Sequence, residues 1–263
     1  MNRGVMSIAL FVVAAVIVAL PASAADPAAD RAARARAHVQ RAQAQYAKRD
    51  YLAAVDSCFF AINEKDDLFD AHFQRGLAYL ARHEHDKAIR SFDRAIELDA
   101  ASALAHSHRG FAHGAIGRFD ACIADQDTAL ELAPTLAIAL ARRGAARFAR
   151  NDLAKARQDI DKALAIDPTL GEALCTRALM TLATGDTAAA VADIEAAIKA
   201  DPQDARAHAE RGKLWTLQGN ARAAARSLDE AIRLDTRNAP AYLTRAQNAL
   251  AAKKYEAARD DFT

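Results

Sequence analysis

The chain has 263 residues, of which 52% are apolar and only 6% aromatic, and it contains 10 glycines and 6 prolines. Much of the apolar fraction is alanine, the residue that costs least in a helix, so the composition favours close-packed helices and argues against an extensive β architecture. The 35 basic and 34 acidic residues balance, and 34 of each remain after residue 24, which excludes the strong positive field of a protein that binds nucleic acid or anionic membrane.

Residues 1–24 have the three-part layout of a secretory signal peptide. A basic start at Arg3 precedes an apolar run from Val5 to Leu20, and Ala22 and Ala24 form the A-x-A pattern of a cleavage site. The run has sixteen residues, fewer than the ~20 that span a bilayer comfortably. We expect cleavage after Ala24, a periplasmic or secreted protein, and no stable membrane insertion afterwards. The alternative is a segment retained as an N-terminal anchor.

A short polar linker, residues 25–34, is expected to lead into a sequence that repeats every 34 residues. Position 7 of each repeat is an arginine, with no insertion between repeats: Arg41, Arg75, Arg109, Arg143, Arg177, Arg211 and Arg245. The predicted repeats are 35–68, 69–102, 103–136, 137–170, 171–204, 205–238 and a partial 239–263. Such a period is typical of stacked helical hairpins, because one hairpin alone cannot bury both of its apolar faces.

Each repeat is predicted to hold two helices, A and B. Positions 20, 24, 27 and 28 are small or apolar, with Gln126 at position 24 as the exception, and this i, i+4, i+7, i+8 spacing makes one apolar stripe on helix B. Glycine and asparagine at position 15 suit a left-handed residue that ends helix A: Gly117, Asn151, Gly185 and Gly219. Proline at position 32 stops helix B: Pro134, Pro168 and Pro202.

This pattern resembles the tetratricopeptide repeat family. The small residue at position 8, alanine at 20 and 27, the large apolar residue at 24 and proline at 32 carry the resemblance, which covers residues 35–263. It implies an all-α, right-handed solenoid of stacked helix-turn-helix repeats. The chain departs from the family pattern at position 7, where arginine replaces the usual apolar residue.

The position 7 arginines recur together with acids at positions 23 and 25 of helix B. Because an arginine fork can bind both oxygens of a carboxylate, we hypothesise a structural ladder in which these arginines reach the acids, or Ser57, Ser91 and Ser227. The alternative is a row of basic groups displayed to a ligand.

Four histidines follow the repeat at position 4: His38, His72, His106 and His208. Their periodicity indicates packing between helices, and we predict no metal site; a metal-binding periplasmic protein is the weaker alternative. Cys58, Cys122 and Cys175 lie in different repeats and are expected to be free, buried thiols. No G-x-S-x-G, C-x-x-C or Walker motif occurs, so we predict neither an enzyme nor a cofactor.

The resemblance implies that helix A lines a concave groove that grips an extended peptide. Its lining positions predict a partner-binding groove formed by Phe73, Gln74, Leu77, Leu80, His108, Phe111, Arg142 and Phe148. The middle of this groove is expected to be apolar and aromatic, with charge toward its ends. Alternatively, half of these residues pack between adjacent A helices.

The predicted function is therefore an exported protein–protein interaction scaffold with a protein or peptide partner and no nucleic acid. The alternative is a repeat module or accessory subunit of a larger envelope enzyme or assembly.

Overall fold

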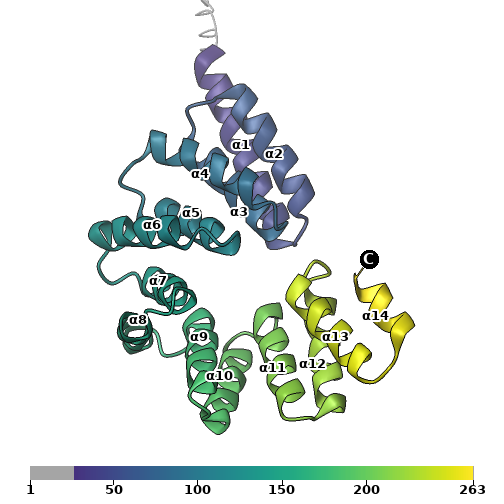
Figure 1. The fold of residues 1–263 in the computed structure, drawn as a ribbon. Coiled ribbons are helices and arrows are strands. Elements are labelled where there is room, and N and C mark those ends of the chain that lie inside the picture. The colour runs from purple at the N-terminus through teal and green to yellow at the C-terminus, as the bar shows by residue number, and fades with distance from the viewer. Residues whose placement is uncertain (1–26, 263) are drawn as a thin grey trace, which may run out of the picture.

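The computed structural model describes residues 27–262, and the predicted signal peptide, residues 1–24, lies outside them. Within the described range the chain forms fourteen α-helices and no β-strand (Figure 1). In chain order they are α1 (Pro27–Ala47), α2 (Tyr51–Glu64), α3 (Phe69–Ala81), α4 (His85–Leu98), α5 (Ala103–Ala115), α6 (Phe119–Leu132), α7 (Ala137–Ala149), α8 (Leu153–Ile166), α9 (Gly171–Ala183), α10 (Thr187–Ala200), α11 (Ala205–Leu217), α12 (Ala221–Leu234), α13 (Ala239–Ala251) and α14 (Tyr255–Phe262). Odd-numbered helices are helix A of a repeat and even-numbered ones helix B, so the predicted all-α repeat solenoid is confirmed.

The first helix differs from the expected boundary. Residues 25–34 were expected to be a linker, but α1 already begins at Pro27, so residues 27–34 belong to its first turns. Proline is well suited to the start of a helix, where its missing N–H is not needed, and Asp30 in the first turn favours the positive end of the helix dipole.

The turn between helices A and B has the same conformation in all repeats. Position 15 has a positive φ at the four predicted residues, with values of 76° at Gly117, 64° at Asn151, 88° at Gly185 and 71° at Gly219. It is also left-handed at Arg49, His83 and Lys253, with φ of 61°, 56° and 59°. A side chain at positive φ is disfavoured, so these three turns are held by their surroundings.

Within a hairpin, position 8 of helix A packs directly on position 24 of helix B. A Cβ atom added to Gly76 would stand 2.5 Å from Cε1 of Phe92, and one added to Gly212 would stand 2.5 Å from Cδ2 of Leu228. Both large side chains are completely buried. The glycines are therefore required by the close approach of the two helices, which lets Phe92 and Leu228 fill the interior of their hairpins.

The arginine ladder forms, and Arg109 shows its geometry. Its Nε and Nη2 donate to Oδ2 and Oδ1 of Asp125 in its own hairpin, at 3.0 and 2.6 Å, while its Nη1 donates to Oδ1 of Asp93 in the preceding hairpin, at 2.9 Å. The same bonds recur with Arg143 between Asp159 and Asp127, and with Arg245 between Asp261 and Asp229. These arginines are internal struts and are not displayed to a ligand.

Serines replace the acid in two rungs, as predicted. Nε of Arg75 donates to Oγ of Ser91, and Nε of Arg211 donates to Oγ of Ser227, both at 3.1 Å. The first repeat differs: Arg41 is exposed, and Ser57 donates instead to Oε1 of Gln45 at 2.7 Å.

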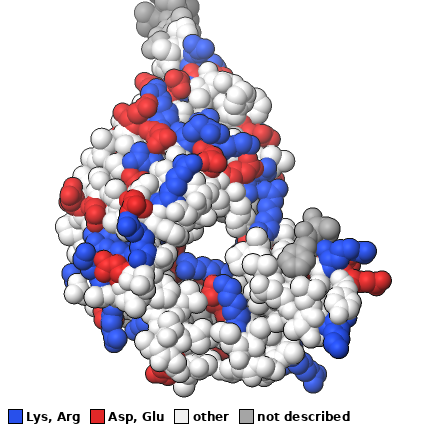
Figure 2. All heavy atoms as spheres, in the orientation of Figure 1, with Lys and Arg blue, Asp and Glu red and all other residues white. Residues whose placement is uncertain are grey.

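The stack curves toward its A helices. Each A helix contacts the A helix of the next repeat, from α1 with α3 to α11 with α13, whereas no such contact joins successive B helices in the described part of the chain. The A helices therefore form the inner, concave surface. The curvature brings the last repeats back toward the first (Figure 1). Figure 2 shows a central opening, and charges of both signs are interspersed over the visible face.

Candidate functional site

Three of the eight predicted groove residues pack within the hairpin of α3 and α4. Phe73, Leu77 and Leu80 on α3 lie against a buried cluster that includes Ile89 and Phe92 of α4. The ring of Phe73 is 5.8 Å from that of Phe92, in an edge-to-face arrangement. These three side chains are only partly accessible, so their main role is to hold helices together.

A cluster around Arg142 is the most organised feature of the concave surface. Arg142 lies on α7 and is only 8% exposed. Its Nε and Nη2 each donate to a carboxylate oxygen of Glu172 on α9, at 3.2 Å. Its Nη1 donates to Oγ of Ser107 on α5 at 3.1 Å, and its guanidinium lies 4.7 Å from the ring centre of Phe111. One side chain thus connects three successive repeats.

His108 completes this cluster as a neutral base. Burial, together with the positive charge of Arg142, lowers the pKa of His108 to about 3. The neutral ring can therefore accept a bond from Nη1 of Arg142, which lies 3.4 Å from Nδ1. Burial alone would raise the pKa of Glu172, but the charge and the hydrogen bonds of Arg142 keep it below its usual value. Glu172 therefore stays ionised, and its two hydrogen bonds with Arg142 fix both side chains at this point of the concave surface.

The structure therefore brings together four predicted residues: His108, Phe111 and Arg142, and also Phe73, whose ring centre is 5.7 Å from that of His108. Gln74 is buried on α3, and Phe148 is partly buried near the end of α7. Glu172 is not among the predicted groove residues, although it lies at position 2 of its helix A. Its partner is position 6 of the preceding repeat, a pairing that the repeat pattern alone does not specify.

Charge continues along the inner surface into the sixth repeat. Glu210 on α11 is 8% exposed, and Nζ of Lys213 donates to its Oε1 at 2.9 Å. The pKa of Arg206 is raised because the carboxylates of Glu172 and Glu210 outweigh the effect of its burial. The expectation of an apolar middle with charge at the ends was therefore wrong: paired charges lie in repeats four to six.

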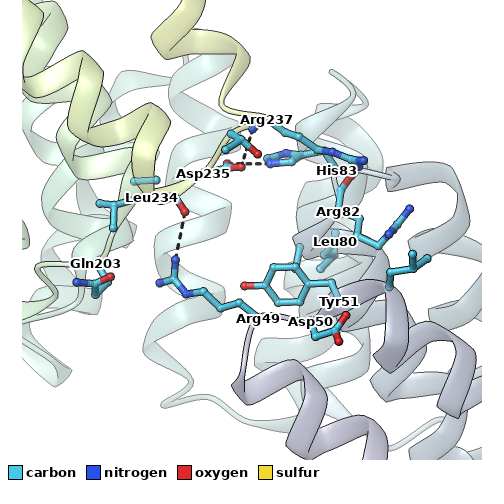
Figure 3. A pocket seen from close by; sticks show the side chains of 14 residues that line it. Arg49, Asp50, Tyr51, Leu80, Arg82, His83, Gln203, Leu234, Asp235 and Arg237 are labelled. Atoms are coloured by element: carbon cyan, nitrogen blue, oxygen red, sulfur yellow. Dashed lines mark hydrogen bonds and ion pairs between the residues drawn. The ribbon is translucent and has the colours of Figure 1, made fainter.

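A second site lies where the two ends of the stack meet. We call the contact among Arg49, Arg82, His83, Leu234, Asp235 and Arg237 the clasp. Nη1 of Arg49 donates to the carbonyl of Leu234 at 3.2 Å, and Nη1 of Arg237 donates to the carbonyl of Arg82 at 2.8 Å. Nε2 of His83 lies 2.9 Å from Oδ2 of Asp235. Figure 3 shows these side chains reaching across the gap from opposite sides.

The clasp surrounds a cavity and is not densely packed. The cavity has a volume of about 570 Å³, and its lining includes Tyr51 and Leu80 from one end and Gln203 from the other. The side chains of His83 and Asp235 are 43% and 29% exposed. Partly exposed pairs of this kind stabilise a contact by only about 0–1 kcal/mol.

His83 and Asp235 each shift the pKa of the other. The hydrogen bond to Asp235 raises the pKa of His83, against the opposing effects of burial and of Arg237. Burial would raise the pKa of Asp235, but the bonds from His83 and from the backbone of Arg237 lower it. Protonated His83 and ionised Asp235 therefore support each other.

The remaining histidines and the cysteines have structural roles. Nε2 of His72, His106 and His208 lies 2.8, 3.2 and 3.1 Å from a carbonyl six residues earlier, in the loop that precedes each helix A. This agrees with the predicted packing role. Among residues 27–262 no group of three or more His, Cys, Asp or Glu side chains could hold a metal ion. The three cysteines are free and buried, as predicted.

Two segments, residues 69–100 and 171–204, match family models described as tetratricopeptide repeat. The chain is a tetratricopeptide repeat (TPR) protein. The sequence matches no curated protein. This fold supports a role as a protein–protein interaction scaffold. No helix in the described part of this TPR protein has the length and apolar character needed to cross a membrane.

Solved structures share the fold at low identity. A tetratricopeptide repeat protein from Parabacteroides merdae is 19% identical, with a TM-score of 0.59, and the match covers 87% of this chain and 91% of that one. PilW, described as a type IV pilus biogenesis factor, is 21% identical with a TM-score of 0.59 and coverage of 87% and 98%. Pseudomonas aeruginosa pilF is 15% identical with a TM-score of 0.57 and coverage of 83% and 99%.

Proposed function

We propose that this TPR protein is an exported, non-enzymatic scaffold that holds an extended segment of a partner protein along its concave surface. The observation that carries the proposal is the Arg142 cluster on the inner face, in which one arginine on α7 pairs with Glu172 on α9 and donates to Ser107 on α5. A rigid, charged surface spanning three repeats suits an extended chain, whose backbone and side chains offer donors and acceptors at regular intervals.

The charge of the inner surface indicates the chemistry of the partner. Arg142 pairs with Glu172 and Lys213 pairs with Glu210, so the inner surface carries charges of both signs. A segment of mixed charge can pair with both signs, whereas a strongly basic or acidic segment would meet like charges. The partner segment is therefore one of mixed charge.

Export rests on residues 1–24, with their basic start, apolar run and A-x-A cleavage pattern. Cleavage after Ala24 would deliver the scaffold to the periplasm or outside the cell. N-terminal sequencing of the protein from its native cells tests this: a mature chain starting at Ala25 is expected, and an intact Met1 would contradict it.

A second candidate function is an accessory subunit of a larger envelope assembly. It is favoured by exposed apolar side chains on the last repeat, where Leu243, Leu250 and Tyr255 are 49%, 44% and 66% exposed. A neighbouring subunit could cover them. Sedimentation analysis of the protein isolated from native cells distinguishes the accessory-subunit function from the scaffold function, because a subunit of an assembly would sediment as part of a stoichiometric complex.

The scaffold function is tested with a photo-reactive phenylalanine analogue. Placed at Phe148 on the inner helix α7, it should yield a discrete cross-linked adduct in intact cells. The matched control is Phe59, an aromatic residue on the outer helix α2 that is 55% exposed. Equal adducts at both positions, or adducts only at Phe59, would contradict binding on the concave surface.

A further inference from the structure

The clasp joins segments that are far apart in the sequence. Its hydrogen bonds connect residues separated by 152 to 185 positions, and they link the turns of the first two repeats to the loop between the sixth and seventh. Together with the curvature of the stack, they close the concave surface into a ring (Figures 1 and 2).

We propose that the clasp is a reversible gate that opens to admit a partner segment sideways and closes behind it. The inference deepens the proposed function and rests on it, because the admitted segment is the one held on the concave surface. The occupant is an extended polypeptide segment, which the closed ring encircles.

The composition of the clasp supports reversibility. Successive repeats are joined by buried apolar clusters, such as the one that contains Leu140, Ile160 and Leu174. The clasp instead consists of hydrogen bonds made by exposed or partly exposed side chains around a cavity. Breaking it exposes little apolar surface, so opening does not require any repeat to unfold.

The backbone conformation of two turns allows the clasp to close. Arg49 and His83 occupy the left-handed turn position, where other repeats have Gly117, Gly185 and Gly219. At this position the side chain leaves the tip of the turn and projects toward the opposite end of the stack (Figure 3). Both turns that face the loop at 234–237 therefore carry a side chain able to bridge the gap.

Closure is tested by cross-linking. In the His83→Cys/Asp235→Cys protein, a short bis-maleimide should link the two thiols within one chain. Asn151→Cys/Asp235→Cys is the matched control, because Asn151 has the same turn position in the fourth repeat, away from the clasp. The native cysteines are buried and should not react. Equal linking in both proteins, or none in the first, would overturn closure.

Opening is tested by the distance between spin labels at Lys48→Cys and Arg233→Cys, both exposed residues beside the clasp. We expect a short and a long population, and Arg49→Ala/Arg237→Ala should shift the distribution toward the long one by several-fold. This variant removes only exposed side chains, so circular dichroism should show an unchanged fold. A single distance that the variant does not change would overturn the gate.

Admission of a partner is tested with the photo-reactive analogue at Phe148. The His83→Cys/Asp235→Cys protein, locked with bis-maleimide before mixing with periplasmic extract, should give several-fold less of the adduct seen in cells than the unlocked protein. Equal yields would overturn the gate and leave the proposed function standing. No adduct with either protein would overturn the proposed function, and with it the admission of a partner, whereas the spin-label distances would be unaffected.

Discussion

Arg143 holds both carboxylate oxygens of Asp159, with Nε 2.9 Å from Oδ2 and Nη2 2.8 Å from Oδ1, while its Nη1 reaches Asp127 of the preceding hairpin at 2.7 Å. The side chain of Asp159 is 3% exposed. Arg143 therefore joins two repeats and pairs a buried carboxylate, which Nη1 of Arg147 also binds at 2.6 Å.

Replacing this strut should destabilise the protein. Arg143→Gln removes the bidentate partner of Asp159 and leaves its buried charge with the single bond from Arg147, which costs roughly 1–3 kcal/mol. Guanidinium denaturation followed by circular dichroism measures the change. Arg157→Gln is the matched control, because Arg157 stands on α8 of the same repeat with its side chain 79% exposed, and it should change stability by less than about 0.5 kcal/mol. Equal effects of the two variants would contradict the strut.

The close approach of α3 and α4 predicts a compensating pair of substitutions. Gly76→Ala places a methyl group against the ring of Phe92 and should cost about 1–3 kcal/mol. In a background of Phe92→Leu the same change should cost less, because the smaller side chain leaves room. Thermal unfolding of the four proteins of this double-mutant cycle gives the coupling energy; a coupling of zero would show that the two residues do not compete for space.

The three thiols should be unreactive in the folded protein. Burial raises the pKa of Cys58 and Cys175 to about 12 and that of Cys122 to about 11. Because the thiolate is the reactive form, a disulfide reagent at pH 8 should modify none of them within minutes and all three in denaturant. Rapid modification of one thiol under native conditions would show that its repeat opens.

The clasp should be tightest in mildly acidic solution. The raised pKa of His83 means that its contribution is complete below about pH 6.5 and is lost as the pH rises through its folded pKa. The lowered pKa of Asp235 means that its contribution is complete above about pH 4 and is lost as the pH falls through its folded pKa. Burial and the charge of Arg237 oppose protonation of His83, so the effect is modest.

Spin-label distances across the clasp measure this dependence. The closed population should fall between pH 6 and pH 8, and His83→Gln should remove that step without changing the fold. A step of the same size in the glutamine variant would assign the pH dependence to another group.

The sequence was sufficient for features that repeat. Arg109 and Asp125 have counterparts at the same positions in other repeats, so the ladder could be inferred from the sequence. Gly117 likewise predicted a left-handed turn that the structure contains. Local spacing and helix periodicity determine such features, because equivalent positions pack against each other in every repeat.

Features that occur once were not predictable in this way. Arg142 meets Glu172 through a pairing that no other repeat copies, and it adds charge where apolar residues were expected. The contact between Arg49 and Leu234 depends on the small rotation between each repeat and the next, summed over the whole stack. The repeat pattern does not specify the size of this rotation. The strained turn at His83 also lacks the glycine signal that reveals its counterparts.

The arginine ladder does not join all hairpins equally, and this affects the order in which the repeats separate on unfolding. Nη1 of Arg109, Arg143 and Arg245 binds an aspartate sixteen residues earlier, in the preceding hairpin. Sixteen residues before Arg75 stands Phe59, which cannot accept such a bond. In a linear array, cooperativity depends on coupling between nearest neighbours, so a weak boundary uncouples first. The hairpin of α1 and α2 should therefore separate more readily than a hairpin that such a bond joins to its neighbour, and its separation would break the clasp bond of Arg49 while those of His83 and Arg237 remain.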